Sequence, residues 1–156
     1  MTPETSIPPK PDSVHGHLSG DHDRLEGLLR ALCEDVGGGQ LETAGDRYRA
    51  FGEGLACHIR REEELLFPVL EAKTNAHGGG LIEVMRQDHR ILLQVLAVMR
   101  SGLDAQDFGR FGAALEVLRE ILPSHSAKEK RLVYPLIDRL LAEEERLAFT
   151  ERLKRA

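Results

Sequence analysis

One pattern of polar residues occurs twice in this chain, with the second copy 67 positions after the first. The paired positions are His22 and His89, His58 and His125, and Glu62 and Glu129. The second and third members belong to a longer repeated segment, so that residues 58–68 align with residues 125–135. Because the same register holds across more than forty residues, the pattern predicts two similar structural halves related by a pseudo-twofold axis.

Apolar residues recur every three or four positions in long stretches, which is the spacing of amphipathic helices. The predicted helices span about residues 20–36, 41–72, 81–100 and 104 or 107 to beyond 125. Ser19 is the expected N-cap of the first helix. Pro135 either kinks the fourth helix or separates a last helical segment that reaches about Arg152. Short connections between long helices predict an all-α, up-down-up-down antiparallel four-helix bundle.

The domain organisation follows from length and composition. Residues 1–14 are rich in proline and small polar residues, which predicts a disordered N-terminal tail. Residues 15–156 are expected to form a single domain.

Composition limits the classes of partner and compartment. The formal net charge of −5 argues against a nucleic-acid partner. No apolar run is long enough to span a bilayer, and the N-terminus lacks the apolar stretch of a signal peptide. Two cysteines, Cys33 and Cys57, form no disulfide framework and are expected to be reduced, which favours a cytoplasmic location.

The six repeated polar residues all fall within the apolar stripes of their predicted helices and should face the core. A buried carboxylate is costly unless it is paired, and no Lys or Arg shares the stripe with Glu62 or Glu129. A bound cation would remove this cost. A histidine and a glutamate four residues apart lie on one helix face, so both can reach the same metal.

Six ligands exceed the four that zinc usually takes, and they suit two ions that share the two carboxylates as bridges. Imidazole and carboxylate ligands in a helix bundle favour non-haem iron, with manganese second and zinc less favoured. Coordination positions left over would accept an oxo or hydroxo group, O2, peroxide or NO.

The double His…His-x-x-x-Glu motif resembles the hemerythrin-like (HHE cation-binding) domain family. Leu-Phe-Pro follows shortly after Glu62, and Val-Tyr-Pro follows shortly after Glu129, as in that family; the resemblance covers about residues 15–150. It implies terminal iron ligands at His22, His58, His89 and His125. It further implies bridging carboxylates at Glu62 and Glu129, together with an oxo bridge.

The chain departs from oxygen-carrying hemerythrins at two places. Those proteins have two histidines one turn apart on the third helix, where this chain has Met85 and Leu93 around His89. They also have Asp five residues after the last histidine, where this chain has Lys130. The symmetric set is closer to the di-iron domain of repair-of-iron-centres proteins and to short, single-domain bacterial hemerythrin-like proteins. Peroxide, O2 or NO chemistry is therefore expected rather than reversible O2 carriage.

The expected function is protection against oxidative or nitrosative stress by a non-haem di-iron protein that binds or reacts with small oxidants. Catalase-like or NO- or O2-reducing turnover is one form of this function, and it would require an electron donor. The alternatives are a sensor or store for O2, NO or iron without turnover, an iron donor for repair of iron-sulfur centres, and a metal-stabilised bundle without redox chemistry. The protein is expected to be a monomer or homodimer.

Three aromatic residues lie near the motif. Tyr48 occupies an apolar stripe, and its hydroxyl either bonds to backbone or water at the bundle end or lies in a second shell around the metals. Phe67 and Tyr134 are expected to pack at the end of the bundle beside the prolines.

Other polar residues near the motif are expected to face solvent. Glu63 and Glu64 should be ordinary surface charges, since their repeat partners carry the opposite charge. His15 and His17 should be exposed at the junction with the tail, or serve as exchangeable ligands.

Overall fold

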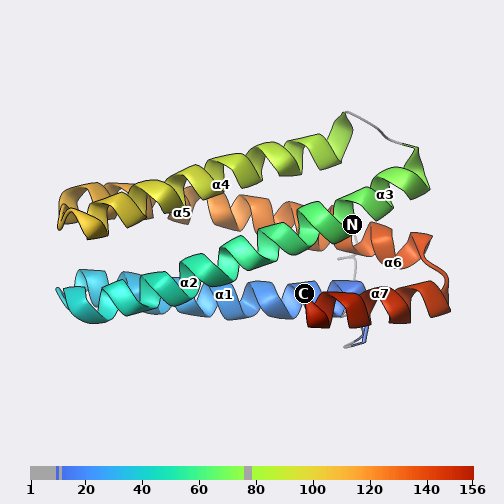
Figure 1. Ribbon diagram of the computed structural model, residues 1–156, viewed down its shortest axis with the longest axis horizontal. Helices are drawn as coiled ribbons and strands as arrows, with labels where there is room; N and C mark the ends of the chain where they lie inside the picture. The colour runs from blue at the N-terminus through green and yellow to red at the C-terminus, as the bar shows by residue number, and fades with distance from the viewer. Residues whose placement is uncertain (1–9, 11, 76–78) are drawn as a thin grey trace, which may run out of the picture.

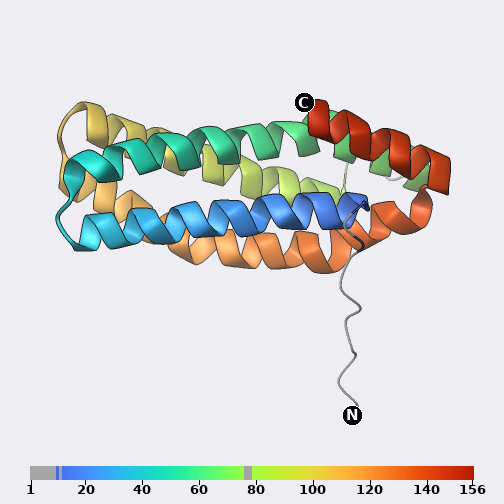
Figure 2. The same cartoon turned by 90° about the horizontal axis from the view of Figure 1, so that it is seen from below.

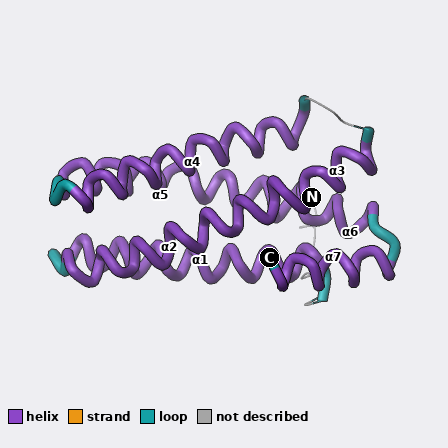
Figure 3. The backbone as a smooth tube through the Cα atoms, in the orientation of Figure 1, coloured by secondary structure: helices purple, strands orange, loops and turns teal. Residues whose placement is uncertain are grey.

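A computed structural model describes residues 10, 12–75 and 79–156, and within these residues it contains helices and no strand (Figure 3). The helices are α1 (Val14–Gly37), α2 (Leu41–Arg61), α3 (Phe67–Thr74), α4 (Gly80–Asp104), α5 (Phe108–Lys128), α6 (Tyr134–Leu140) and α7 (Glu143–Arg155). Two π-helical turns, η1 (Glu62–Leu66) and η2 (Glu129–Val133), join α2 to α3 and α5 to α6.

The helices form two antiparallel hairpins that pack together as a bundle (Figures 1 and 2). One hairpin pairs α1 with α2, and the other pairs α4 with α5; these two pairs make the most extensive contacts. The turns of both hairpins lie at the same end of the bundle, while α3, α6 and α7 lie at the opposite end. The predicted all-α four-helix bundle with two similar halves is confirmed. Within the described residues, no helix has the length and apolar character needed to cross a membrane.

Helix α1 begins at Val14, six residues before the expected start, and its N-cap is Ser13 rather than Ser19. The Ser13 Oγ accepts a hydrogen bond from the Gly16 N–H at 2.9 Å. The carboxylate of Asp138, on α6, accepts from the N–H groups of Val14 and of the next residue, at 3.1 Å each. These contacts satisfy the first free N–H groups of the helix, so the early start is stable. Most of the expected tail, residues 1–9 and 11, lies outside the described residues.

The expected last helical segment is present as α7, but the chain breaks at a different place. Pro135 lies in the first turn of α6, where its missing N–H is tolerated. The helix ends at Leu140, and extended backbone at Leu141 and Ala142 lets α7 turn back over the bundle end. Phe149 and Leu153 of α7 are buried there.

The interior consists of two apolar cores with a polar layer between them. The core at the hairpin turns includes Leu25, Leu55, Leu92 and Leu122, and the core at the other end includes Leu18, Leu66, Met85 and Val133. Helices α1 and α4 contribute to both cores, whereas α2 and α5 contribute to the first core and the π turns that follow them contribute to the second. His22 therefore lies between Leu18 and Leu25, and the other three histidines occupy the matching place on their own helices.

Candidate metal centre

The six predicted ligand residues meet in the polar layer between the two cores. Each is almost fully buried, with at most 1% of its surface exposed. They form two overlapping groups whose ligand-type atoms lie within 4.8 Å of one another. The groups consist of His22, His58, Glu62 and Glu129, and of Glu62, His89, His125 and Glu129. Each group takes two histidines from one hairpin, and both groups include both glutamates.

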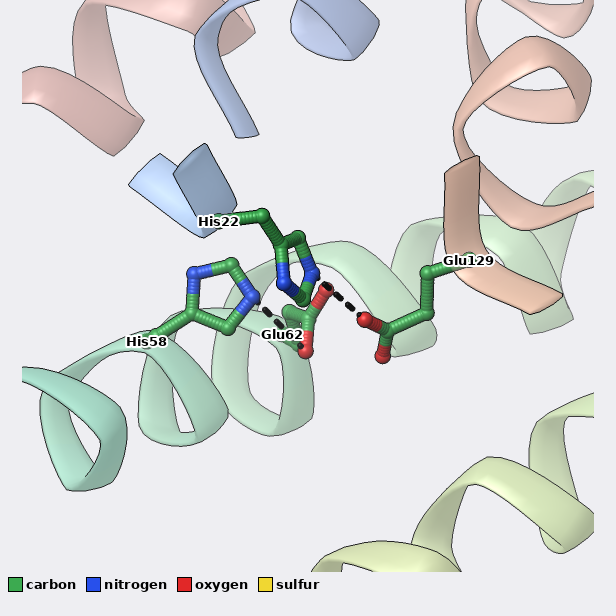
Figure 4. A group of neighbouring side chains, drawn as sticks. All are labelled: His22, His58, Glu62 and Glu129. Atoms are coloured by element: carbon green, nitrogen blue, oxygen red, sulfur yellow. Dashed lines mark hydrogen bonds and ion pairs between the residues drawn. The ribbon is translucent and has the colours of Figure 1, made fainter. Parts of the chain in front are cut away.

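The first group is drawn in Figure 4. His22 extends from α1, His58 comes from the last turn of α2, and Glu62 and Glu129 are the first residues of the two π turns. The His22 Nε2 atom lies 2.7 Å from the Glu129 Oε2 atom. The His58 Nε2 atom lies 3.5 Å from the Glu62 Oε2 atom. Both imidazoles therefore direct Nε2 toward the carboxylates.

The second group contains polar atoms that lie within ion-pair distance of one another but form no hydrogen bond of acceptable geometry. Its ring-nitrogen to carboxylate-oxygen separations run from 2.9 Å, between His125 and Glu129, to 3.4 Å, between His89 and Glu129. The His89 Nε2 atom is also 3.2 Å from the Glu62 Oε2 atom. Yet these four atoms have no hydrogen-bond partner of acceptable geometry among the described residues. Buried atoms of this kind normally have partners, so their convergence fits a cation bound at their common centre.

The outward ring nitrogen of each histidine is held by a second side chain. His58 Nδ1 lies 2.8 Å from an Asp21 carboxylate oxygen, and His125 Nδ1 lies 3.3 Å from the matching oxygen of Asp88. His22 Nδ1 lies 3.0 Å from the Ser126 hydroxyl. Partners at Nδ1 are typical of metal-binding histidines, because they orient the ring and direct Nε2 at the metal.

His89 completes this set through Glu63, which contradicts the expectation that Glu63 is an ordinary surface charge. The His89 Nδ1 atom lies 2.8 Å from Glu63 Oε1, and the Glu63 side chain is 30% exposed. Glu63 also accepts a hydrogen bond from Arg86 at 3.1 Å. The pairing joins the first π turn to α4. It lies outside the sequence repeat, because the repeat partner of Glu63 is Lys130.

The buried glutamates and histidines shift one another's pKa values. Burial would lower the pKa of His58 and His89, but the nearby Glu62 and Glu129 carboxylates raise it to about 10 in both rings. Burial would raise the pKa of Glu129, but the adjacent imidazoles of His125 and His22 hold it well below its ordinary value. Without a metal, protons on His58 and His89 therefore balance the carboxylate charge.

Asp21 is held in its charged form by the same arrangement. Burial would raise the pKa of its carboxyl group, but hydrogen bonds to His58 and Arg24 keep it far below its ordinary value. A charged Asp21 favours the His58 tautomer that keeps its proton on Nδ1 and leaves Nε2 free to bind metal.

The two π turns bring an aromatic residue onto the ligand face. In each turn the N–H at position i+5 bonds to the glutamate carbonyl, so that Phe67 bonds to Glu62 and Tyr134 bonds to Glu129. An α-helix would bring position i+4 over the glutamate, whereas the wider turn brings position i+5 there. Phe67 stacks on the His89 ring, with centroids 5.4 Å apart and an interplanar angle of 11°.

Tyr134 is a further residue at this site that the sequence interpretation missed. It was expected to pack at the bundle end, but its hydroxyl lies among the ligand atoms. The hydroxyl oxygen is 2.7 Å from His22 Nε2 and 2.7 Å from Glu62 Oε1. Burial and the negative charges of Glu129 and Glu62 raise its pKa well above the ordinary value. The signal in the sequence was the Tyr-Pro dipeptide. Pro135 lacks the N–H that would continue the α-helical hydrogen bonds, and the hydrogen bonds just before it change to the wider π pattern.

Three other candidates lie apart from the two ligand groups. The Tyr48 hydroxyl donates to the Leu96 carbonyl at 2.6 Å in the core near the hairpin turns, which is the bond to backbone that one of its two interpretations expects. His15 and His17 lie on α1 and are partly buried rather than exposed. Among the described residues, neither histidine belongs to the two ligand groups.

A surface groove of about 460 Å³ between α1 and α5 comes close to the centre. Its lining includes Leu29, Leu122, Ser126 and Ala127, with Arg30 and Lys130 among the charged residues at the surface. Ser126 is shared between the groove and the centre, since its hydroxyl bonds to His22.

Comparison with known families agrees with this geometry. The family described as the hemerythrin HHE cation-binding domain matches residues 14–137, which include all six predicted ligands. Neither the curated proteins nor the solved structures contain a significant match to the chain. The matched region covers most of the chain and contains the two buried His and Glu groups that fit a metal site. The chain therefore belongs to the hemerythrin HHE cation-binding domain family.

Proposed function

We propose that this protein holds a non-haem di-iron centre that reacts with small oxidants, namely peroxide, O2 or NO. Two imidazoles would bind each iron, His22 and His58 at one position and His89 and His125 at the other. The observation that carries the proposal is the set of buried imidazole and carboxylate atoms that converge between the four helices, four of which have no hydrogen-bond partner among the described residues.

The positions of the carboxylate oxygens support two bridged ions rather than one. Glu129 Oε1 faces His89 and His125, whereas its Oε2 faces His22. Glu62 Oε2 lies between His58 and His89, which belong to different positions. Each glutamate could therefore hold both ions, and two such carboxylates would keep the ions close enough for two-metal chemistry.

The donor set favours iron over zinc. Each position offers two imidazoles and two shared carboxylates, so four donors come from these residues alone. A structural zinc site would be complete with four donors, whereas iron takes further ligands and can bind a small molecule there. Manganese has similar preferences and is the second candidate.

The irons would supply electrons by cycling between the ferrous and ferric states. The polypeptide would exclude bulk water, because both apolar cores close over the polar layer. It would also orient each ring through its Nδ1 partner and give small molecules a way in along the groove that reaches Ser126. Diatomic molecules and peroxide are small enough to pass between packed side chains, which suits so enclosed a centre.

This chemistry would serve protection against oxidative or nitrosative stress in the cytoplasm, where Cys33 and Cys57 would stay reduced. Catalytic turnover would need an external electron donor. The centre lies within one chain, so a monomer would suffice, and a homodimer would be equally compatible with it.

Rapid mixing of the ferrous protein with hydrogen peroxide, or with NO, tests the proposal. We expect an absorbance change faster than that of free ferrous iron at the same concentration, and its loss in Glu129→Ala, which removes a bridge. Repeated turnover would show that the protein is an enzyme, and a stable adduct would show that it is a sensor or store. A response no faster than that of free iron, with iron passing readily to a chelator, would contradict oxidant chemistry and favour an iron donor.

A further inference from the structure

The two halves of the centre differ at one repeated position. Phe67 follows Glu62 by five residues and presents a phenyl ring to His89. Tyr134 follows Glu129 by five residues and presents a hydroxyl to the first ligand group. Both side chains are fully buried. The repeat therefore places an oxygen donor at one metal position and an apolar ring at the other.

The Tyr134 hydroxyl has more polar neighbours than hydrogen bonding accounts for. In addition to His22 and Glu62, it lies 3.1 Å from Glu129 Oε2 and 3.3 Å from His58 Nε2. A hydroxyl has one proton to donate, and an ionised carboxylate can only accept. One proton cannot form hydrogen bonds to both glutamates. The position of the hydroxyl oxygen is instead that of one metal ligand among several around a common centre.

The separations are those of neighbouring ligands on one ion. With metal–ligand bonds of about 2.1 Å, ligands at right angles lie about 3.0 Å apart. The four distances from the Tyr134 oxygen, to atoms of His22, Glu62, Glu129 and His58, run from 2.7 to 3.3 Å. Two of these distances are shorter and two are longer than the separation of about 3.0 Å expected for neighbouring ligands.

A second difference between the halves points to the same metal position. The Nδ1 partners of His58, His89 and His125 are carboxylates, whereas that of His22 is the neutral Ser126 hydroxyl. The metal position of His22 thus has one carboxylate fewer among its Nδ1 partners. An anionic oxygen ligand at that position would give the two halves the same number of anionic groups.

We propose that Tyr134 is a seventh protein ligand, binding through its phenolate oxygen to the metal held by His22 and His58. The inference rests on the proposed iron centre. On binding, the O–H bond breaks, its proton is released to solvent, and an oxygen–metal bond forms without electron transfer. The two metal positions are then chemically different, with one phenolate at the first and none at the second.

The test uses the fact that the chain contains only two tyrosines. A phenolate bound to ferric iron gives a broad visible absorption band, and excitation in that band enhances phenolate ring vibrations in the resonance Raman spectrum. We expect both signals in the iron-loaded wild-type protein and in Tyr48→Phe. In Tyr134→Phe we expect neither signal, with the iron content per chain unchanged.

Two results would overturn the inference while the iron centre stands. One is iron-loaded wild-type protein without phenolate vibrations, and the other is their persistence in Tyr134→Phe. Should Tyr134→Phe fail to fold, the spectra of the wild type and Tyr48→Phe still decide, because signals lost in Tyr48→Phe contradict the assignment. A wild-type protein that binds no iron would overturn the proposed function and this inference together, and metal analysis separates that case from the others.

Discussion

Each imidazole of the centre is held through both of its nitrogens. Nε2 faces the carboxylates, while Nδ1 is bound by Asp21, Glu63, Asp88 or Ser126. Lys128 adds a 2.6 Å contact to Asp88, so the supporting carboxylate is itself held in place. Ring orientation is therefore set before any metal arrives, and metal binding need not reorganise the side chains.

Replacing Asp21 with asparagine should weaken metal binding while the bundle stays folded. An amide can keep a hydrogen bond to His58, but it lacks the charge that favours the metal-binding tautomer. We expect metal affinity to fall by roughly 10- to 100-fold, measured by competition with a chelator. The matched control is Asp46→Asn, since Asp46 is 76% exposed and pairs only with Arg49 among the described contacts. Equal affinities in the two variants would show that Asp21 has no part in the centre.

At the level of elements, the helices and their inward faces could be predicted because a 3.6-residue period is visible in the sequence. The same 3.6-residue period does not predict which residues face the site at the π turns. It places Val133 over Glu129, whereas the wider turn also brings Tyr134, one position later, onto that face. The Tyr134 hydroxyl among the ligand atoms was therefore missed, although the spacing of glutamate, aromatic residue and proline repeats in the sequence.

Contacts between distant segments were the other part that could not be predicted. Helix α1 starts early because Asp138, more than a hundred residues later, accepts from its first N–H groups. Glu63 pairs with His89 across two helices, and nothing in its local sequence indicates this. The six central residues were predictable because they repeat, whereas the residues that support them repeat only in part: Asp21 and Asp88 correspond, but Glu63 and Ser126 do not.

At the scale of the whole molecule, the polar layer divides the hydrophobic interior, so the charge state of that layer affects stability. In the metal-free protein, imidazolium groups at His58 and His89 face Glu62 and Glu129. Raised histidine pKa values stabilise the fold fully below pH 6.5, the ordinary histidine value, and this contribution is lost as the pH rises through about 10.

We therefore expect the melting temperature of the metal-free protein to fall between about pH 7 and pH 10. The metal-loaded protein should fall less over this range, because the metal replaces the two protons. At the acid side the lowered pKa values of Glu62 and Glu129 act in the opposite sense, so their contribution is lost as the pH falls. Thermal unfolding of both forms across this pH range measures the difference. Parallel curves for the two forms would contradict the exchange of protons for metal.

Elemental analysis of metal per chain, on protein expressed without added metal, decides whether the centre holds two irons. We expect close to two irons in the wild type and the loss of at least one metal in Glu62→Ala and in Glu129→Ala, with helical content retained. Full metal retention in both variants would contradict the bridging role. One zinc per chain in the wild type, or no metal at all, would contradict the di-iron centre itself.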